Sequence, residues 1–495
     1  LKPFWLKRSG GSRQRCWNET AMAKRKWGSE DVEKLCVDVS QPDKTQDQVS
    51  FKRGFVNSLQ RKAGPRQLKN MRHEARLGVN VTNLIFDLNK EEHKDVFTWS
   101  DGQLSFRSSD MIVNRITKIR TILPSEQMPE LLVQLSGTPF YAAVDDTYIL
   151  GRHNVNNYYP LPAQECRNSV QQAIADLILD ATQRLGHDKI FWIGTQEPTH
   201  TTGFTREDLP KKESANPFVR KQTGKRCRKL NVTRFIKYWR GIVRKTRAAL
   251  PDAKFGAMQL NSHDADIYMY AAREMVRLDC QIDLFTVQRY KSQWRIQENL
   301  HKVYDIFQSS PGFEHVRVAY DRYSFNNDPS VEGRMYWLTT AGMSSFLRDE
   351  NQIMDHAEIM HSWSYQITGL EWSHGGKTSL LPQLVGWLQE APKVKRSVSF
   401  SSESGLGAFA LAERRAGRAS VAIWNLGETR REVEVILQGG GGVFKGEPHV
   451  LKGASDAIEA AVGQTELRKQ GENVAISDQG AGFALEPNDF VLISI

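Results

Sequence analysis

The sequence predicts an α/β protein, a (β/α)8 TIM barrel followed by a C-terminal antiparallel β-sandwich. Three observations support this fold class. The chain has 495 residues, enough for a barrel of about 250 residues or more and a smaller domain. Between residues 51 and 392, short apolar runs alternate with amphipathic stretches of helical length. After residue 393 the helical stretches fade, and short strand-like runs are separated by Gly- and Asn-containing turns.

The middle region reads as a series of strand–helix units. Strands that alternate with helices indicate a parallel sheet, and continuous apolar runs are typical of parallel strands buried on both faces. The predicted strands are 79–86, 131–135, 190–193, 255–260, 284–287 and 316–320. The predicted helices are 169–185, 232–249, 264–278, 297–308 and 333–347. A closed barrel is the economical arrangement, and a doubly wound sheet is the alternative.

Three regions follow from this pattern. Residues 1–50 lack clear periodicity and are expected to form an irregular N-terminal segment, and residues 51–392 are expected to form the catalytic barrel. Residues 393–495 are expected to form the sandwich, with one short helix near 454–461. Its predicted strands are 398–401, 408–412, 421–424, 433–437, 474–476 and 490–495.

Charge and composition limit the partners. The chain carries 67 basic and 57 acidic residues, a formal net charge of +10, which favours an anionic partner over a neutral one. The strongest basic cluster is 211–229, expected to lie in a loop after the fourth strand. We find no RNP string, zinc finger or regular basic helix, so nucleic acid is not the expected partner. No apolar run reaches about 18 residues, so no membrane span is expected.

The most informative short stretch is FWIGTQEPTHTTGF, residues 191–204. Its apolar run ends at Gly194, and Glu197-Pro198 follows at once. In a (β/α)8 barrel the chemistry lies at the carboxyl ends of the strands. A proline holds the residue before it in extended geometry, so the Glu197 side chain is aimed in a fixed direction. Counting along the chain makes this strand the fourth of the barrel.

The Glu-Pro pair at the end of a fourth strand resembles the acid/base signature of the retaining (β/α)8-barrel glycosidase clan. The whole string resembles glycoside hydrolase family 86, the β-agarases and β-porphyranases. This resemblance implies hydrolysis of β-linked galactan chains of a red-algal polysaccharide, agar or porphyran, without a cofactor. It also implies an extracellular or periplasmic location. Because the chain begins at Leu1 rather than Met, we expect a mature form or a fragment.

Retaining hydrolysis needs a second carboxyl group about 5–5.5 Å from the acid. The clan places a glutamate at the end of strand seven, here expected in 315–326, but Asp321 is the carboxylate at that place. Asp321 is therefore one candidate nucleophile. Glu371, in the string TGLEWSHGG after a predicted eighth strand, is another, and Glu332 is a third.

Aromatic and polar residues near the predicted strand ends are candidates for substrate binding, since aromatic faces pack on sugar rings and polar groups hold hydroxyls. His200 is not expected to hold a metal, because no second histidine stands at ligand spacing. The substrate-binding candidates are Trp192, Gln196, His200, Asn261, His263, Arg289, Tyr290, Arg322, Tyr323, Trp363, Trp372 and His374.

Several functions remain open at this stage. The leading hypothesis is a galactan hydrolase, and the basic cluster at 211–229 would suit a sulfated galactan, since arginine matches sulfate oxygens. Another glycosidase of the same clan would act on xylan or on a β-galactoside chain. The missing strand-seven glutamate also allows a catalytically inactive carbohydrate-binding barrel.

Overall fold

We describe the fold from a computed structural model of the chain. The structure describes residues 32–42, 53–57, 72, 81–88, 95–123, 128, 130–136, 162, 164–186, 189–194, 217–257, 265–289, 294–323, 340–354, 360–365, 373–374, 377–378, 381–400, 406–413, 417–438, 449–453, 468–469 and 481–494.

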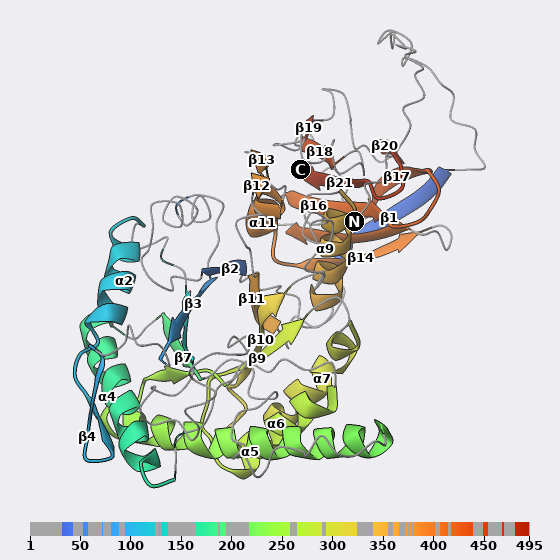
Figure 1. The fold of residues 1–495 in the computed structure, drawn as a ribbon. Coiled ribbons are helices and arrows are strands. Elements are labelled where there is room, and N and C mark those ends of the chain that lie inside the picture. Colours follow the sequence, from blue (N-terminus) through green and yellow to red (C-terminus); the bar gives the residue numbers. More distant parts are fainter. Residues whose placement is uncertain are drawn as a thin grey trace, which may run out of the picture.

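The middle of the chain forms an eight-stranded sheet in which every strand is parallel to its neighbours (Figure 1). Along the chain, β7 is the fourth strand of this sheet and β10 is the seventh, as the sequence predicted. In sheet order the strands are β8 (Lys254–Phe255), β7 (Ile190–Ile193), β6 (Glu130–Ser136), β3 (Val81–Asp87), β2 (Arg53–Asn57), β11 (Met360–Tyr365), β10 (Arg317–Tyr323) and β9 (Leu284–Arg289).

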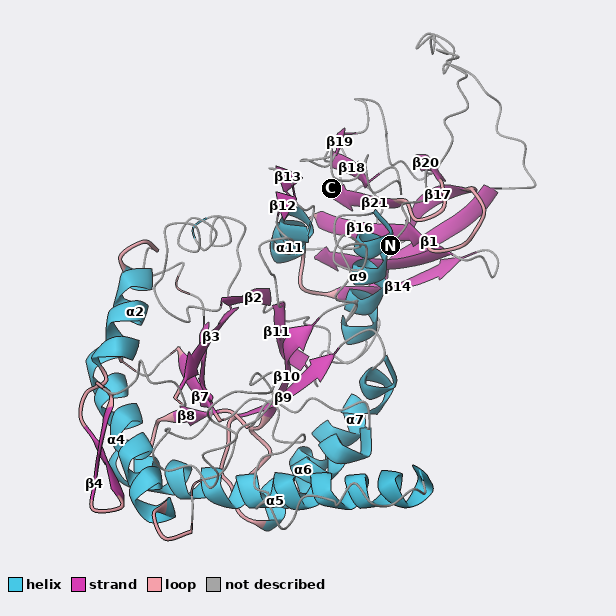
Figure 2. Cartoon of the chain, viewed as in Figure 1, coloured by secondary structure: helices cyan, strands magenta, loops and turns pink. Residues whose placement is uncertain are grey.

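The two end strands of this sheet, β8 and β9, come together. A parallel bridge joins Gly256 to Leu284. The N–H of Ala257 donates to the Leu284 carbonyl over 2.7 Å, and the N–H of Asp283 donates to the Phe255 carbonyl over 2.7 Å. Figure 2 shows the strands arranged around a common centre.

Alternate residues of the strands face two different cores, as the two-residue period of a strand requires. On β7, Phe191 and Ile193 belong to a small inner cluster with Leu132 of β6, Leu284 of β9 and Ala319 of β10. The intervening residues of β6 and β7 join a large cluster shared with the helices. The inner cluster therefore draws its residues from strands near both ends of the sheet.

Helices cover the outside of this sheet (Figure 2). The predicted helices form, with shifted ends: the one predicted at 333–347 is α9 (Thr340–Met354), and the one predicted at 232–249 begins at Pro217. The helices are α2 (Asp110–Arg120), α4 (Arg167–Leu185), α5 (Pro217–Ala249), α6 (Ala265–Arg277), α7 (Trp294–Gln308), α9 and α11 (Leu381–Glu390).

The early start of α5 corrects the expectation for the basic cluster. Residues 217–229 belong to this helix and do not form a loop. Proline is favoured at the first position of a helix, where its missing N–H costs nothing, so Pro217 is a suitable start. A regular basic helix is therefore present, although its expected absence was one reason not to expect nucleic acid as a partner.

A hairpin that the sequence analysis did not predict lies on α4. Its strands are β4 (Phe97–Ser100) and β5 (Gln103–Phe106), joined by Asp101 and Gly102 with φ of 52° and 71°. Positive φ at both central residues is the geometry that Asp-Gly favours in two-residue hairpins. The N–H of Leu104 donates to Ser169 Oγ of α4 over 3.2 Å.

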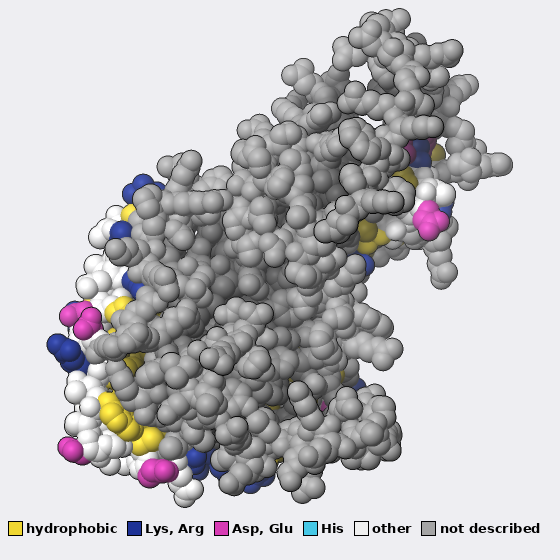
Figure 3. All heavy atoms as spheres, in the orientation of Figure 1, with side chains coloured by type: hydrophobic (Ala, Val, Ile, Leu, Met, Phe, Trp, Pro, Cys, Tyr) yellow, Lys and Arg dark blue, Asp and Glu magenta, His cyan; other side chains and the backbone are white. Residues whose placement is uncertain are grey.

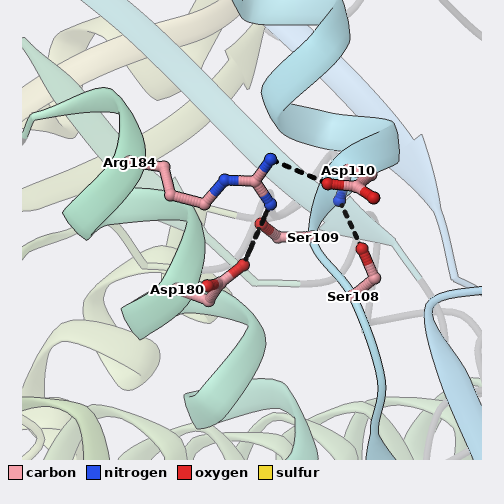
Figure 4. Close-up of polar contacts among 5 residues, drawn as sticks. All are labelled: Ser108, Ser109, Asp110, Asp180 and Arg184. Atoms are coloured by element: carbon pink, nitrogen blue, oxygen red, sulfur yellow. Dashed lines mark hydrogen bonds and ion pairs between the residues drawn. The ribbon is translucent and has the colours of Figure 1, made fainter.

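Polar contacts tie the start of α2 to α4 (Figure 4). Arg184 contacts Asp110 at 2.7 Å and Asp180 at 3.3 Å, and the buried hydroxyl of Ser109 donates to Asp180. The Arg184 guanidinium holds the pKa of Asp110 below its usual value. Asp110 also lies in the first turn of α2, where the helix dipole favours a negative charge.

The second sheet has nine strands and combines both ends of the chain. It is mixed, because β1 pairs antiparallel with β14 and parallel with β17. Residues 32–42 were expected to be irregular and are instead a strand of this sheet. In order the strands are β19 (Arg468–Lys469), β18 (His449–Gly453), β21 (Phe490–Ser494), β16 (Arg418–Asn425), β15 (Leu406–Glu413), β14 (Lys395–Phe400), β1 (Val32–Pro42), β17 (Arg431–Gln438) and β20 (Ala481–Leu485).

One face of the second sheet packs on helices of the first region. Trp387 Nε1 of α11 donates to Ser494 Oγ over 2.9 Å, and Ser344 Oγ of α9 donates to the carbonyl of Asn488 over 2.9 Å. Residues from β1, β15, β16, β17, β20 and β21 share a separate core. The predicted elements at 454–461 and 474–476 lie outside the described residues, and β18 and β20 were not predicted.

Candidate active site

The chain leaves β7 against α5, and this contact fixes where the Glu-Pro segment begins. All four residues of β7 are buried. A Cβ at Gly194 would come within 2.7 Å of Phe235 Cζ and 3.1 Å of Trp239 Cδ2. Trp239 is itself held by a 3.0 Å hydrogen bond from its Nε1 to the Gly256 carbonyl beside β8. Only glycine allows this close approach of strand and helix.

A β-bulge lies at the carboxyl end of β10. In the pairing with β9, Tyr320 is opposite Val287 and Arg322 is opposite Gln288, so Asp321 is the extra residue. The pairing of β10 with β11 is irregular over the same residues. Bulges bend a strand and redirect side chains, and they are frequent next to active sites.

β7 and β10 are not neighbours in the sheet, yet they approach each other inside it. The guanidinium of Arg317, on β10, lies 5.0 Å from the centre of the Phe191 ring on β7. Lys254 Nζ of β8 lies 5.6 Å from the same ring, and Arg317 is 3.9 Å from Glu130 of β6. Because both strands run in the same direction, their carboxyl ends reach the same edge of the sheet.

Two buried polar residues on the inner side of the sheet were missed by the sequence analysis. Gln134 and Thr286 have no exposed surface, and each lies two residues after a member of the inner cluster, Leu132 and Leu284. Gln134 is the register partner of Ile193 at the end of β7. A glutamine within the apolar run ELLVQLS was the available signal.

Some predicted substrate-binding residues lie on neighbouring strands of this edge. Tyr323 of β10 is the register partner of Arg289 on β9, and Arg322 precedes it. Trp363 of β11 is the partner of Tyr320. His374 belongs to β12 (Ser373–His374), which pairs only with β13 (Lys377–Thr378) among the described strands.

The prediction that Trp192 binds substrate is wrong. It is fully buried, and its Nε1 donates to Thr182 Oγ1 of α4 over 3.0 Å. Trp192 belongs to the outer core, opposite in strand alternation to Phe191 and Ile193. It therefore has no free ring face for a sugar.

The other predicted site residues fall in segments that the structure does not describe. They are Gln196, Glu197, His200, Asn261, His263, Tyr290, Glu332, Glu371 and Trp372. Asp321 itself lies on β10, within the described strand.

Two kinds of feature are absent from the described residues. No group of three or more His, Cys, Asp or Glu side chains among them is placed to hold a metal ion. No helix in the same part of the chain is long and apolar enough to cross a membrane.

Comparison with known proteins identifies a shared fold. Neither a protein-family profile nor a curated protein sequence matches the chain. Among solved structures, the family 51 α-L-arabinofuranosidase AbfB from Bifidobacterium longum matches with a TM-score of 0.58 at 9% identity, covering 94% of this chain and 99% of that one.

Two further structures match over a similar length. A GH30 endoxylanase from Clostridium papyrosolvens has a TM-score of 0.55 at 11% identity, covering 93% of this chain and 99% of that one. A family 44 xyloglucanase from Paenibacillus polymyxa has a TM-score of 0.53 at 10% identity, covering 94% and 99%. The chain therefore shares its fold with glycoside hydrolases of families 30, 44 and 51.

Proposed function

We propose that the protein is a retaining glycoside hydrolase that cleaves β-linked galactan chains of red-algal polysaccharide, agar or porphyran, outside the cell. In this proposal the eight-stranded sheet is a (β/α)8 barrel and the nine-stranded sheet is a β-sandwich. Glu197 donates the proton to the leaving oxygen, and Asp321 attacks the anomeric carbon. The fold shared with glycoside hydrolases supports the reaction class, and the string FWIGTQEPTHTTGF supports the galactan.

The observation that carries the proposal is the approach of β7 and β10 at Phe191 and Arg317. Glu197 follows β7 in the sequence, and Asp321 lies near the end of β10, so the proposal assigns both carboxyl groups to the same edge of the sheet. Glu197 is three residues beyond Gly194, and three extended residues reach about 10 Å. That reach is enough to bring a carboxyl group towards a partner across the sheet interior.

The bulge supports Asp321 as the nucleophile. Aspartate is shorter than glutamate by one methylene, so its carboxyl group lies about 1.5 Å further back. A bulge bends the strand locally and can move the backbone towards the substrate by a comparable amount. Glu371 is the competing nucleophile, six residues beyond the end of β11 at Tyr365.

For the substrate, we propose that Arg289, Tyr323 and Trp363 contribute on the strand side. The remaining candidates are Arg322 of β10, His374 of β12 and, outside the described residues, Gln196, His200, Asn261, His263, Tyr290 and Trp372.

The test is hydrolysis of agarose, porphyran and xylan, measured by reducing-end release. We expect activity on a galactan, and a loss of about 10³-fold or more in Glu197→Gln. In Asp321→Gly, azide should replace the missing carboxylate in a single displacement at the anomeric carbon, which restores cleavage and gives a glycosyl azide of inverted configuration. Glu371→Gly is the matched comparison, because rescue there instead would assign the nucleophile to Glu371.

Two outcomes would contradict the proposal. Full activity of Glu197→Gln would remove its role as the acid. Release from xylan but from neither galactan would move the substrate to another polysaccharide, while leaving the reaction class intact.

A further inference from the structure

The helix α5 is strongly basic along its whole length. α5 carries twelve Lys and Arg residues and no Asp or Glu over its 33 residues. The other 462 residues hold the remaining 55 basic and all 57 acidic residues, a formal net charge of −2. On the described surface around α2 and α4, basic and acidic side chains are mixed (Figure 3).

Several polar contacts anchor α5. In the C-terminal half, Arg244 contacts Asp279 at 3.6 Å, Arg247 contacts Asp283 at 2.7 Å, and Lys245 donates to Gln172 over 3.1 Å. These contacts hold the helix to the body of the protein.

The N-terminal half contains what we call the basic segment, residues 217–229. It carries six of the twelve basic residues. At its end, Lys229 lies 5.2 Å from the Tyr270 ring of α6, and the next residue, Leu230, is 42% exposed. The basic residues of the segment are Arg220, Lys221, Lys225, Arg226, Arg228 and Lys229.

The basic segment extends beyond the carboxyl edge of the sheet. Phe235 is level with Gly194, the residue that follows β7. Lys229 is six residues earlier on the helix and Pro217 is eighteen, which places them about 9 Å and about 27 Å further along the axis at 1.5 Å per residue. Arg247, near the other end of α5, contacts Asp283 just before β9 begins, so the helix runs from the carboxyl to the amino ends of the strands.

Figure 1 shows one end of α5 extending past α6. This end is the N-terminal one, because α6 contacts Lys229 and Thr233 while α4 contacts Tyr238 and Lys245. The basic segment therefore lies beside the edge at which Glu197 and Asp321 are proposed to act.

The composition of the segment is unfavourable for the helix itself. Lys221, Lys225 and Lys229 are spaced four residues apart, and like charges at this spacing each cost about 0.2–0.5 kcal/mol. The first turn has no acidic residue, although the helix dipole favours one there. A segment chosen only for stability would not have this pattern, so the charge points to a ligand.

We propose that the basic segment of α5 is a docking surface for an anionic polysaccharide, outside the candidate active site. It would hold a stretch of chain that bears sulfate or carboxylate groups while a neighbouring stretch enters the site. The inference rests on the proposed function for its choice of polysaccharide. A polysaccharide is favoured over nucleic acid because the segment borders the candidate active site of a fold shared with glycoside hydrolases.

The test uses the full chain with Glu197→Gln, so that binding is measured without cleavage. One variant replaces Lys225, Arg226, Arg228 and Lys229 by Gln. A control variant removes four exposed charges away from α5 and has the same net charge: Lys34, Arg107, Lys118 and Arg430 replaced by Gln. Circular dichroism melting confirms that both variants fold.

The probes are porphyran, neutral agarose and a 30-residue single-stranded DNA. For the parent, we expect the Kd for porphyran to rise about 10-fold or more between 50 and 300 mM NaCl, as for other polyanion contacts. The α5 variant should bind porphyran about 10-fold more weakly at 50 mM NaCl. Its Kd should rise less than about 3-fold over the same range of salt. The control variant should stay within about twofold of the parent, and agarose binding should not change with salt.

Equal porphyran binding by the α5 and control variants would overturn the proposal. Tighter binding of DNA than of porphyran at the same salt, lost in the α5 variant, would also overturn it and assign the segment to nucleic acid. These binding measurements do not depend on hydrolysis. If the protein cleaves no galactan but binds porphyran through α5, the proposed function is contradicted and the docking surface is not.

Discussion

Asp283 is the residue that joins the two ends of the parallel sheet. Its N–H donates to the Phe255 carbonyl, and its Oδ2 accepts from the Phe255 N–H over 2.6 Å. The same Oδ2 accepts from Arg247 of α5 over 2.7 Å, and the Asp283 carbonyl accepts from the N–H of Arg317 over 3.0 Å. One residue therefore connects β8, β9, β10 and α5.

We predict that Asp283→Ala lowers the free energy of unfolding by about 2–4 kcal/mol. Phe255 is fully buried, and its N–H would lose the side-chain acceptor, which costs about 1–3 kcal/mol. The pair with Arg247 adds about 1–2 kcal/mol, because both side chains are only about one quarter exposed. Arg247 keeps its bond to the Ala253 carbonyl, which limits its loss. Asp283→Asn retains an oxygen acceptor and should cost about half as much.

The matched control is Asp279→Asn. Asp279 pairs with Arg244 at 3.6 Å, but both side chains are more than half exposed, so the expected cost is under about 0.5 kcal/mol. Asparagine is chosen because Asp279 has a φ of 51°, which asparagine tolerates and alanine does not.

The measurement is urea unfolding followed by circular dichroism at pH 7, with hydrogen exchange of the peptide that contains Phe255. We expect faster exchange of this peptide in Asp283→Ala than in Asp279→Asn. A cost for Asp283→Ala no greater than that of the control, with unchanged exchange, would show that Asp283 does not hold the sheet ends together.

Three other predictions follow from the packing and charges of this region. Gly194→Ala should cost about 1–3 kcal/mol in urea unfolding, because the rings of α5 cannot retreat, whereas Gly241→Ala meets only a movable side chain and should cost under about 1 kcal/mol. Burial raises the pKa of Cys280 to about 12, so iodoacetamide at pH 8.5 should label it only after unfolding, and labelling of the folded protein would contradict this burial. Hydrogen bonds from Arg277 keep the pKa of Glu274 below its usual value. Its stabilisation should be complete above about pH 4.5 and be lost as the pH falls through the lowered pKa of the folded state, so Glu274→Gln should cost about 1 kcal/mol at pH 7 and progressively less in acid.

The strands of the parallel sheet were predictable where the apolar run was longest. The run at 190–193 matches β7, and the run at 131–135 differs from β6 by one residue at each end. Strand β8 has only two residues, Lys254 and Phe255, and is held by its neighbours and by Asp283. The prediction placed this strand at 255–260, of which residues 258–260 lie outside the described part of the chain.

The sequence did not show towards which core each strand residue points or which distant strands pair with each other. All four residues of β7 are buried, so their pattern does not distinguish Trp192, on the helix side, from Phe191 on the inner side. In β1, Leu35 and Val37 are buried and Lys34 is exposed, which is an alternation typical of a strand. Its pairing with β14 and β17 depends on residues more than 350 positions away.

The basic segment was misread for a related reason. We placed the run 211–229 in a loop after the fourth strand, although Lys and Arg are themselves good helix formers. The helix forms because its second half is anchored: Phe235 and Trp239 pack against Gly194, and Trp239 bonds to Gly256. Once the helix is nucleated there, each further step towards its N-terminus fixes the backbone of only one residue and adds one hydrogen bond.

This anchoring links the charge of α5 to the position of the candidate site. The helix that clamps the end of β7 through Phe235 is the same helix that carries the basic segment past the sheet edge. A shift of α5 would therefore move the segment and the start of the Glu197 loop together. If the polysaccharide docks on α5, binding there and placement of the proton donor are mechanically coupled, and Gly194→Ala should weaken hydrolysis of porphyran more than it weakens binding of porphyran.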